Sequence, residues 1–247
     1  MSPIAFPRGR RKLLATAGTL AAAAFMSLPV AASAGLVNYA DFNDTTGLRL
    51  NEMTASDGAL HLTTGLNDDR GSTFTKKRKV DPTKTFHTHF VYPAPNCSTP
   101  AGEGMTFTVQ NDADGASALG NYGSFLGYSG ISPSIAVEYD ISGGENDPTN
   151  NPHIGILENG DTTNHLDYAD QTVSGIGAEV WVDYSAKKHQ VKAYWSEIGS
   201  GKPATPSVAT KVNLAQLLGG PSFAGFTGAT GGYYCEQDIS EWDLQNP

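Results

Sequence analysis

Apolar and polar residues alternate in short runs along this chain, and this pattern predicts β-strands. In one run, Phe86, Thr88 and Phe90 share a face, while His87 and His89 share the opposite face. Strict alternation is typical of a strand with one buried side. Similar runs occupy residues 60–62, 105–109, 135–139, 223–227 and 239–244.

The clearest pair of runs lies at residues 179–184 and 190–195. The residues between them are mostly polar, so the pair predicts a β-hairpin. One short helix is expected over 213–218, with Asn213 as its N-cap and Gly219 as its stop. Many short strands without intervening helices favour an all-β sandwich or barrel, and no repeat or linker divides the chain.

Residues 1–34 have the organisation of a removable export signal. The basic cluster Arg10-Arg11-Lys12 precedes an apolar run over 13–30, and the small-residue site Ala32-Ser33-Ala34 follows. The arginine pair fits either the general secretory route or the twin-arginine route. A membrane anchor is the alternative, although Pro29 disfavours it. We therefore expect a secreted, periplasmic or extracellular protein.

Removal of this segment leaves residues 35–247 as one strongly acidic domain. The whole chain has 16 Lys+Arg against 25 Asp+Glu, a formal charge of −9. Residues 1–34 hold four basic groups and no acidic one, so 12 basic and 25 acidic groups remain, or −13. Such a charge disfavours binding to nucleic acid, because that binding relies on basic groups. No second apolar run is long enough to span a bilayer, so no membrane insertion is expected.

The sequence contains two cysteines, Cys97 and Cys235. An even number of cysteines in an exported chain favours a disulfide, with two unpaired thiols as the alternative.

Candidate metal ligands gather between residues 135 and 156. Glu138 and Asp140 are two residues apart, so on a strand they share one face. Asp147 follows in a loop, and His153 begins the next apolar run. Like charges held together are unfavourable unless a cation lies among them. Carboxylates suit Ca²⁺, and an added imidazole suits a transition ion such as Mn²⁺ or Zn²⁺. A solvated acidic loop is the alternative.

Four segments, taken in order, resemble the L-type (legume-type, concanavalin A-like) lectin family. They are the metal-ligand stretch with its Glu-x-Asp, Asp-Pro and His-Ile-Gly-Ile elements, the loop and strand at Gly102–Asn111, the glycine-rich loop Gly123–Gly127, and Gly225–Tyr234. The resemblance covers most of residues 36–246, and the order and spacing favour the bacterial branch of the family.

The resemblance implies a jelly-roll β-sandwich of two large antiparallel sheets and two adjacent metal ions. A transition ion, for which we expect Mn²⁺, would be bound by Glu138, Asp140, Asp147 and His153. A Ca²⁺ ion would share Asp140 and Asp147 and add the Ser142 carbonyl and the Asn146 side chain. Gly144 stands where the family has this Asn, and Asn146 is the nearest candidate.

The resemblance also implies a sugar site, formed by Glu103, Ser124, Asn146, Gly232 and Tyr233. Glu103 replaces an Asp of the family. Ser142 stands where the family has an aromatic residue that stacks on the sugar, so Tyr233 or Tyr122 would have to provide this stacking. If the fold holds, a Cys97–Cys235 bridge would brace two loops beside this site. Single sugars bound in the millimolar range contribute only about −4 kcal/mol, so avidity would require several copies, such as a homo-oligomer.

The sequence therefore predicts a non-catalytic, metal-dependent carbohydrate-binding protein whose partners are glycans or polysaccharides. One alternative is a glycoside hydrolase, because Glu138 and Asp140 resemble the start of a Glu-x-Asp-x-x-Glu motif. The second Glu of that motif would fall near Gly143, and Glu145 lies two residues beyond. A further alternative is a surface or adhesive module whose sugar site has decayed.

Overall fold

The computed structural model describes residues 36–143, 147–171 and 177–247, which lie in one compact unit, Ser33–Pro247. The predicted export signal, residues 1–34, lies outside the described residues. Within the described part of the chain, no helix is long and apolar enough to span a bilayer.

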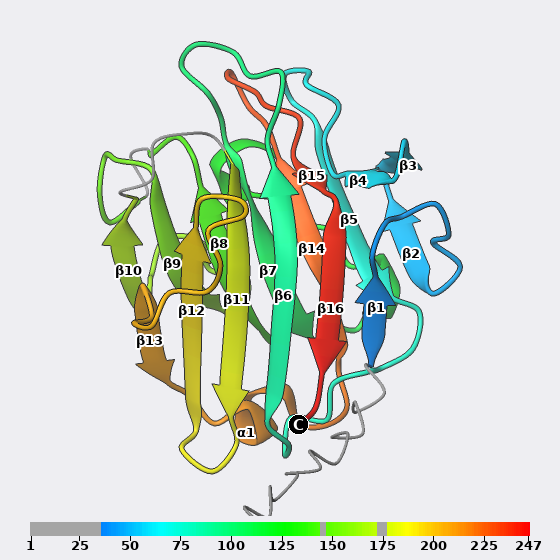
Figure 1. Ribbon diagram of the computed structural model, residues 1–247, viewed down its shortest axis with the longest axis vertical. Coiled ribbons are helices and arrows are strands. Elements are labelled where there is room, and N and C mark those ends of the chain that lie inside the picture. Colours follow the sequence, from blue (N-terminus) through cyan, green and yellow to red (C-terminus); the bar gives the residue numbers. More distant parts are fainter. Residues whose placement is uncertain (1–35, 144–146, 172–176) are drawn as a thin grey trace, which may run out of the picture. The chain divides into compact units, whose positions relative to one another are not determined.

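Two large antiparallel sheets face each other (Figure 1). The six-stranded sheet has the order β1-β16-β6-β11-β12-β13, formed by Val37–Tyr39, Glu241–Gln245, Phe86–Pro93, Gly177–Ser185, Gln190–Ser196 and Val208–Lys211. The seven-stranded sheet has the order β10-β9-β8-β7-β14-β5-β2, formed by Asp167–Asp170, His153–Glu158, Ser134–Asp140, Gly104–Gln110, Phe223–Ala229, Arg70–Thr75 and Leu48–Asn51. The predicted all-β sandwich is therefore confirmed.

Smaller elements close the edges of the sandwich. A three-stranded sheet has the order β15-β4-β3, formed by Asp238–Ile239, Ala59–His61 and Thr54–Ser56. The helices are α1 (Leu214–Leu218) and the 3₁₀ turns η1 (Gly115–Ser117) and η2 (Gly123–Phe125).

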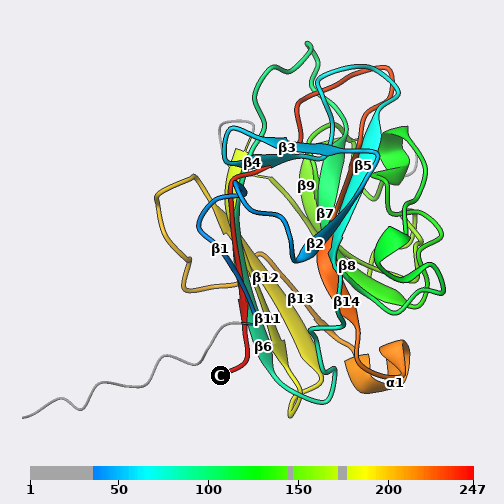
Figure 2. The ribbon, with the colours of Figure 1, turned by 90° about the vertical axis from the view of Figure 1, so that its right-hand side faces the viewer.

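The main core fills the space between the two large sheets, which Figure 2 shows edge-on. Aromatic rings from both sheets meet there. The Phe90 ring of β6 lies 5.0 Å from that of Phe226 in β14, and Tyr92 lies 5.2 Å from Tyr139 in β8. Edge-to-face pairs of this kind stabilise a core beyond simple burial of apolar area.

The hairpin and the helix agree with the sequence. Strands β11 and β12 pair in register, from Ser185 opposite Gln190 to Glu179 opposite Ser196. At helix α1, the Asn213 side chain accepts a hydrogen bond from the Gln216 amide, which satisfies one free N–H group of the first turn. In β6 the expected alternation of buried and partly exposed residues is present.

The central strands β7 and β8 are buried on both faces. Their inner face packs in the main core, and loops that contain η1 and η2 cover the outer face. A second apolar cluster lies under these loops, where Tyr128 and Ile131 pack with Ala136 and Leu157. These loops therefore turn the outer face of the seven-stranded sheet into a second, partly polar interior.

A disulfide joins Cys97 to Cys235 across 138 residues of sequence, as the sequence predicted. Hydrogen bonds run beside it: the Ser98 amide donates to the Tyr234 carbonyl (2.9 Å), and the Glu236 amide donates to that of Pro95 (3.1 Å). The bridge thus fixes the loop after β6 to the segment after β14.

Replacing both cysteines with alanine should lower the free energy of unfolding by about 4 kcal/mol, because the unfolded chain loses a long-range constraint. For a domain of this size the midpoint temperature should fall by roughly 10 °C. Urea titration and calorimetry of the oxidised wild type and of C97A/C235A measure the difference, with reduced wild type as the matched control. Two free thiols in the purified wild type, detected by non-reducing mass spectrometry, would contradict the bridge.

Candidate functional site

Strand β8 places two carboxylates on the outer face of the seven-stranded sheet. Val137 and Tyr139 point into the main core, so Glu138 and Asp140 point away from it, as their spacing predicted. Both carboxylate residues are nonetheless only 1% exposed. The fold therefore buries two acidic groups on one strand.

Strand β9 brings His153 beside these carboxylates. Asp140 pairs with His153 across the ladder, and Glu138 pairs with Gly155. The His153 Nε2 atom lies 3.2 Å from Glu138 Oε1, and its Nδ1 lies 3.1 Å from the Asn151 carbonyl oxygen. Burial opposes the charged imidazole, but the Glu138 carboxylate prevails and raises the pKa of His153 to about 9.

A second imidazole reaches the same carboxylate. His165 lies between β9 and β10, its side chain is 1% exposed, and its Nε2 contacts Glu138 Oε1. The Nε2 atoms of His153 and His165 are 3.4 Å apart. We call these three residues the Glu138–His153–His165 cluster. Sequence reasoning missed His165, because no alternation or spacing links it to the other two.

The electrostatics of the site favour a cation. Burial raises the pKa of Glu138, but the two imidazoles reverse this and leave that pKa below its usual value. Burial and the nearby Asp147 carboxylate raise the pKa of Asp140 to about 7. An ion held by these oxygen and nitrogen atoms would offset the desolvation of the charged groups, so the donor set fits a divalent metal.

Hydrogen bonds connect this acidic strand to the Glu103 loop. Asp140 Oδ1 accepts from the amides of Ser142 (2.8 Å) and Gly143 (3.1 Å). The Ser142 hydroxyl donates to Glu103 Oε2 at 2.7 Å, and the Ile141 amide donates to the Glu103 carbonyl. Ser142, which lacks the aromatic ring of the family pattern, thus holds a carboxylate in place.

Glu103 lies among glycine-rich loops. The Gly102–Glu103 peptide is cis, and a Cβ added at Gly231 would lie 3.0 Å from Glu103 Oε1. The Gly123 amide donates to the Thr230 carbonyl at 2.9 Å, which joins η2 to the same place. Burial and Asp147 raise the pKa of Glu103. Three loops from distant parts of the sequence therefore converge on one carboxylate.

The surface beside Glu103 is open and aromatic. A Cβ at Gly232 would meet no atom, and the Tyr233 side chain packs against Gly102. Tyr233 is 48% exposed and Tyr122 is 42% exposed. Ser124 lies within η2, two residues after the N-cap Tyr122. The structure thus gathers the predicted sugar-site residues Glu103, Ser124, Gly232 and Tyr233, whereas Asn146 lies outside the described residues.

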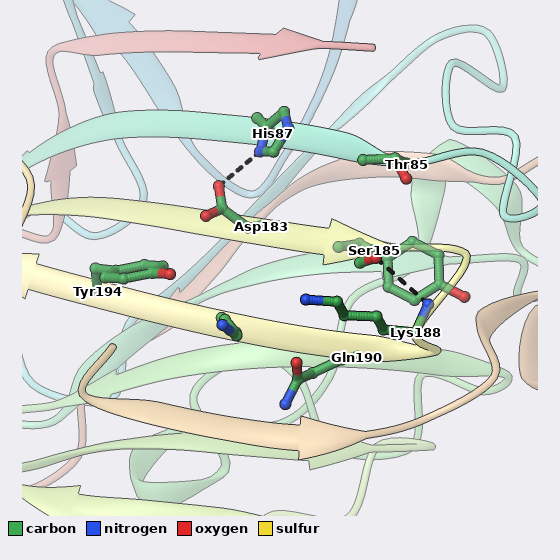
Figure 3. A pocket seen from close by; sticks show the side chains of 9 residues that line it. Thr85, His87, Asp183, Ser185, Lys188, Gln190 and Tyr194 are labelled. Carbon is green, nitrogen blue, oxygen red and sulfur yellow. Dashed lines mark hydrogen bonds and ion pairs between the residues drawn. The ribbon is translucent and has the colours of Figure 1, made fainter. Parts of the chain in front are cut away.

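A hollow of about 250 Å³ lies elsewhere, on the outer face of the six-stranded sheet (Figure 3). His87 and Asp183 line it and form an ion pair at 2.7 Å, with Lys188, Gln190 and Tyr194 nearby. His87 lies on the polar face of β6, which the alternation over residues 86–90 predicted. The hollow is on the opposite sheet from Glu138 and Asp140 and does not involve the acidic strand.

Comparison with solved structures identifies the same fold in plant lectins. The lectin from Bauhinia forficata in complex with GalNAc has a TM-score of 0.73 at 20% identity, covering 85% of this chain and 97% of that one. The basic winged bean lectin with Tn-antigen has a TM-score of 0.69 at 24% identity, covering 84% and 96%.

Curated relatives have a similar sequence over most of this chain. A probable L-type lectin-domain containing receptor kinase S.7 of Arabidopsis thaliana is 27% identical over 95% of this chain and 38% of its own length. The receptor kinase SIT2 of Oryza sativa subsp. japonica is 27% identical over 83% of this chain and 35% of its own. This chain thus spans about a third of these relatives. Because they are plant proteins, the expected bacterial branch is not supported.

The sequence model of the Legume lectin domain family matches residues 36–247, the whole domain seen in the structure. A match to a lectin domain agrees with the predicted lectin-like domain. From this match and the shared jelly-roll sandwich, the chain belongs to the legume lectin (L-type lectin) family.

Proposed function

We propose that this chain is an exported, metal-dependent, non-catalytic lectin whose mature domain is residues 35–247. One observation carries the proposal. The buried acidic strand, whose carboxylates a cation would stabilise, is hydrogen-bonded through Ser142 to Glu103 on an open surface. A metal bound on this strand would thereby fix a sugar-binding carboxylate. Export rests on the signal organisation of residues 1–34.

Two adjacent ions fit the proposed role. Glu138, Asp140, Asp147 and His153 would hold a transition-metal ion, for which the family pattern suggests Mn²⁺. Ca²⁺ would be held by Asp140, Asp147, the Ser142 carbonyl and the Asn146 side chain. The ions supply positive charge that keeps the carboxylates ionised and their loops ordered.

The proposed sugar contacts centre on Glu103, whose carboxylate Ser142 already holds in place. The Glu103 carboxylate accepts hydrogen bonds from sugar hydroxyls, while the Ser124 amide donates one and the Asn146 side chain adds another. The exposed rings of Tyr233 and Tyr122 offer a flat surface to the apolar face of a sugar. Groups ordered in advance lose less entropy on binding, which favours affinity.

The hydrolase alternative finds no support in the described site. Glu138 is 1% exposed and contacts both imidazoles, so it does not face an open cleft. A glycosidase needs two carboxyl groups that reach the glycosidic bond from either side. We therefore propose binding, not hydrolysis, of glycans or polysaccharides.

Removal of metal should destabilise the protein, because ions that bind only the folded state stabilise it. At a concentration one hundred times its Kd, an ion adds about 2.7 kcal/mol. EDTA should then lower the midpoint temperature by roughly 5–10 °C. Calorimetry with and without EDTA, beside metal analysis of the purified protein, measures this. An unchanged midpoint with no bound metal would refute metal dependence.

Glu103→Gln should weaken glycan binding at least tenfold while leaving the midpoint temperature nearly unchanged, because hydrogen bonds to a charged acceptor contribute about 1.5–3 kcal/mol. A glycan array in Ca²⁺, including GalNAc and galactose glycans, would identify a ligand for titration. Glu241→Gln, at an exposed position on β16, is the matched control. Wild-type protein that binds no glycan on the array would instead favour the adhesive module with a decayed site.

A further inference from the structure

His165 is the feature of the metal site that the family pattern does not account for. It lies beyond β9 in a loop anchored by the Leu166 amide, which donates to the Ile156 carbonyl at 2.8 Å. Its ring lies 5.3 Å from that of His153 and 6.2 Å from that of Tyr168. A buried histidine is thus held firmly against the candidate metal ligands.

Two of the three pairs of ligand atoms in the cluster have the spacing of ligands around one ion. His153 Nε2 lies 3.2 Å from Glu138 Oε1 and 3.4 Å from His165 Nε2, and all three ligand atoms lie within 4.8 Å of one another. Donor atoms about 2.1 Å from a common metal are separated from each other by about 3.0–3.4 Å.

The contacts of Glu138 Oε1 within the cluster are not those of ordinary hydrogen bonds. Two imidazole nitrogens approach Glu138 Oε1, yet this buried oxygen makes no hydrogen bond of acceptable geometry. The Asn151 carbonyl can only accept, so it places the proton of neutral His153 on Nδ1. The lone pair of His153 Nε2 is then available to bind a metal ion, as in metal-bound histidine.

The strand partner of Glu138 provides the space for this second imidazole. Gly155 lies opposite Glu138 in the ladder. A Cβ at Gly155 would overlap the Glu138 carboxylate and would lie 2.7 Å from His165 Cδ2. A glycine in the middle of a buried strand weakens that strand, so its presence here is explained by the two side chains that meet above it.

We infer that His165 is a direct protein ligand of the transition-metal ion and makes the site selective for a zinc-class ion rather than Mn²⁺. The inference rests on the proposed metal dependence and extends it to the identity of the ion. Imidazole ligands suit Zn²⁺, whereas Mn²⁺ favours carboxylate and water oxygens. A second imidazole beside the proposed carboxylate ligands therefore shifts the preference toward Zn²⁺. Asp140 lies outside this group of three, and its Oδ1 accepts from two backbone amides.

The test compares metal affinities of the full-length protein, stripped of metal and held in excess Ca²⁺. Zn²⁺ and Mn²⁺ are titrated separately into the wild type, into His165→Gln, and into the control His189→Gln at an exposed position in the β11–β12 turn. We expect His165→Gln to lower Zn²⁺ affinity at least tenfold and Mn²⁺ affinity less than threefold, because Mn²⁺ depends less on imidazole. The control should change neither affinity.

A second measurement needs no variant, in case His165→Gln fails to fold. X-ray absorption at the zinc edge of the wild type should detect two imidazole ligands. One imidazole, or unchanged Zn²⁺ affinity in a folded His165→Gln, would overturn the inference. If the wild type then still binds glycan in a metal-dependent way, the proposed function stands without the inference about His165. If the wild type binds neither Zn²⁺ nor Mn²⁺, both the proposed metal dependence and the inference about His165 are refuted.

Discussion

The burial of negative charge on strand β8 is the constraint on which the candidate site depends. Glu138 and Asp140 lie on the outer face of the seven-stranded sheet, yet both are buried, and the loop that carries His165 contacts Glu138. Desolvating two carboxylates beside a third, Asp147, is costly unless positive charge accompanies them. Positive charge from a divalent ion would offset that cost.

This constraint extends to the molecular surface through a few hydrogen bonds. Asp140 orders the Ser142 and Gly143 amides, Ser142 holds Glu103, and Glu103 meets the glycine-rich loops. The Cys97–Cys235 bridge fixes the segment that carries Tyr233 from the other side. A metal bound in the interior can therefore order a surface it does not touch.

Much of the fold could be predicted from the sequence, because strand periodicity and helix caps depend on near neighbours. The alternation in β6, the β11–β12 hairpin and the Asn213 cap all agree with the structure. The double burial of β7 and β8 could not be predicted, because it depends on loops that fold over the sheet. Short edge strands such as β1, β3 and β10 also escaped notice, since three or four residues give too little alternation.

The sequence by itself determined that Glu138 and Asp140 share a face, that His153 begins the next strand, and that Cys97 and Cys235 are available to pair. Each of these follows from spacing along the chain or from composition. The tertiary structure alone decided that His165 joins the cluster, that Gly155 makes room for it, and that Ser142 links the metal strand to Glu103. The physical reason is that these contacts arise from strand pairing and loop packing, which bring together atoms that no local pattern connects.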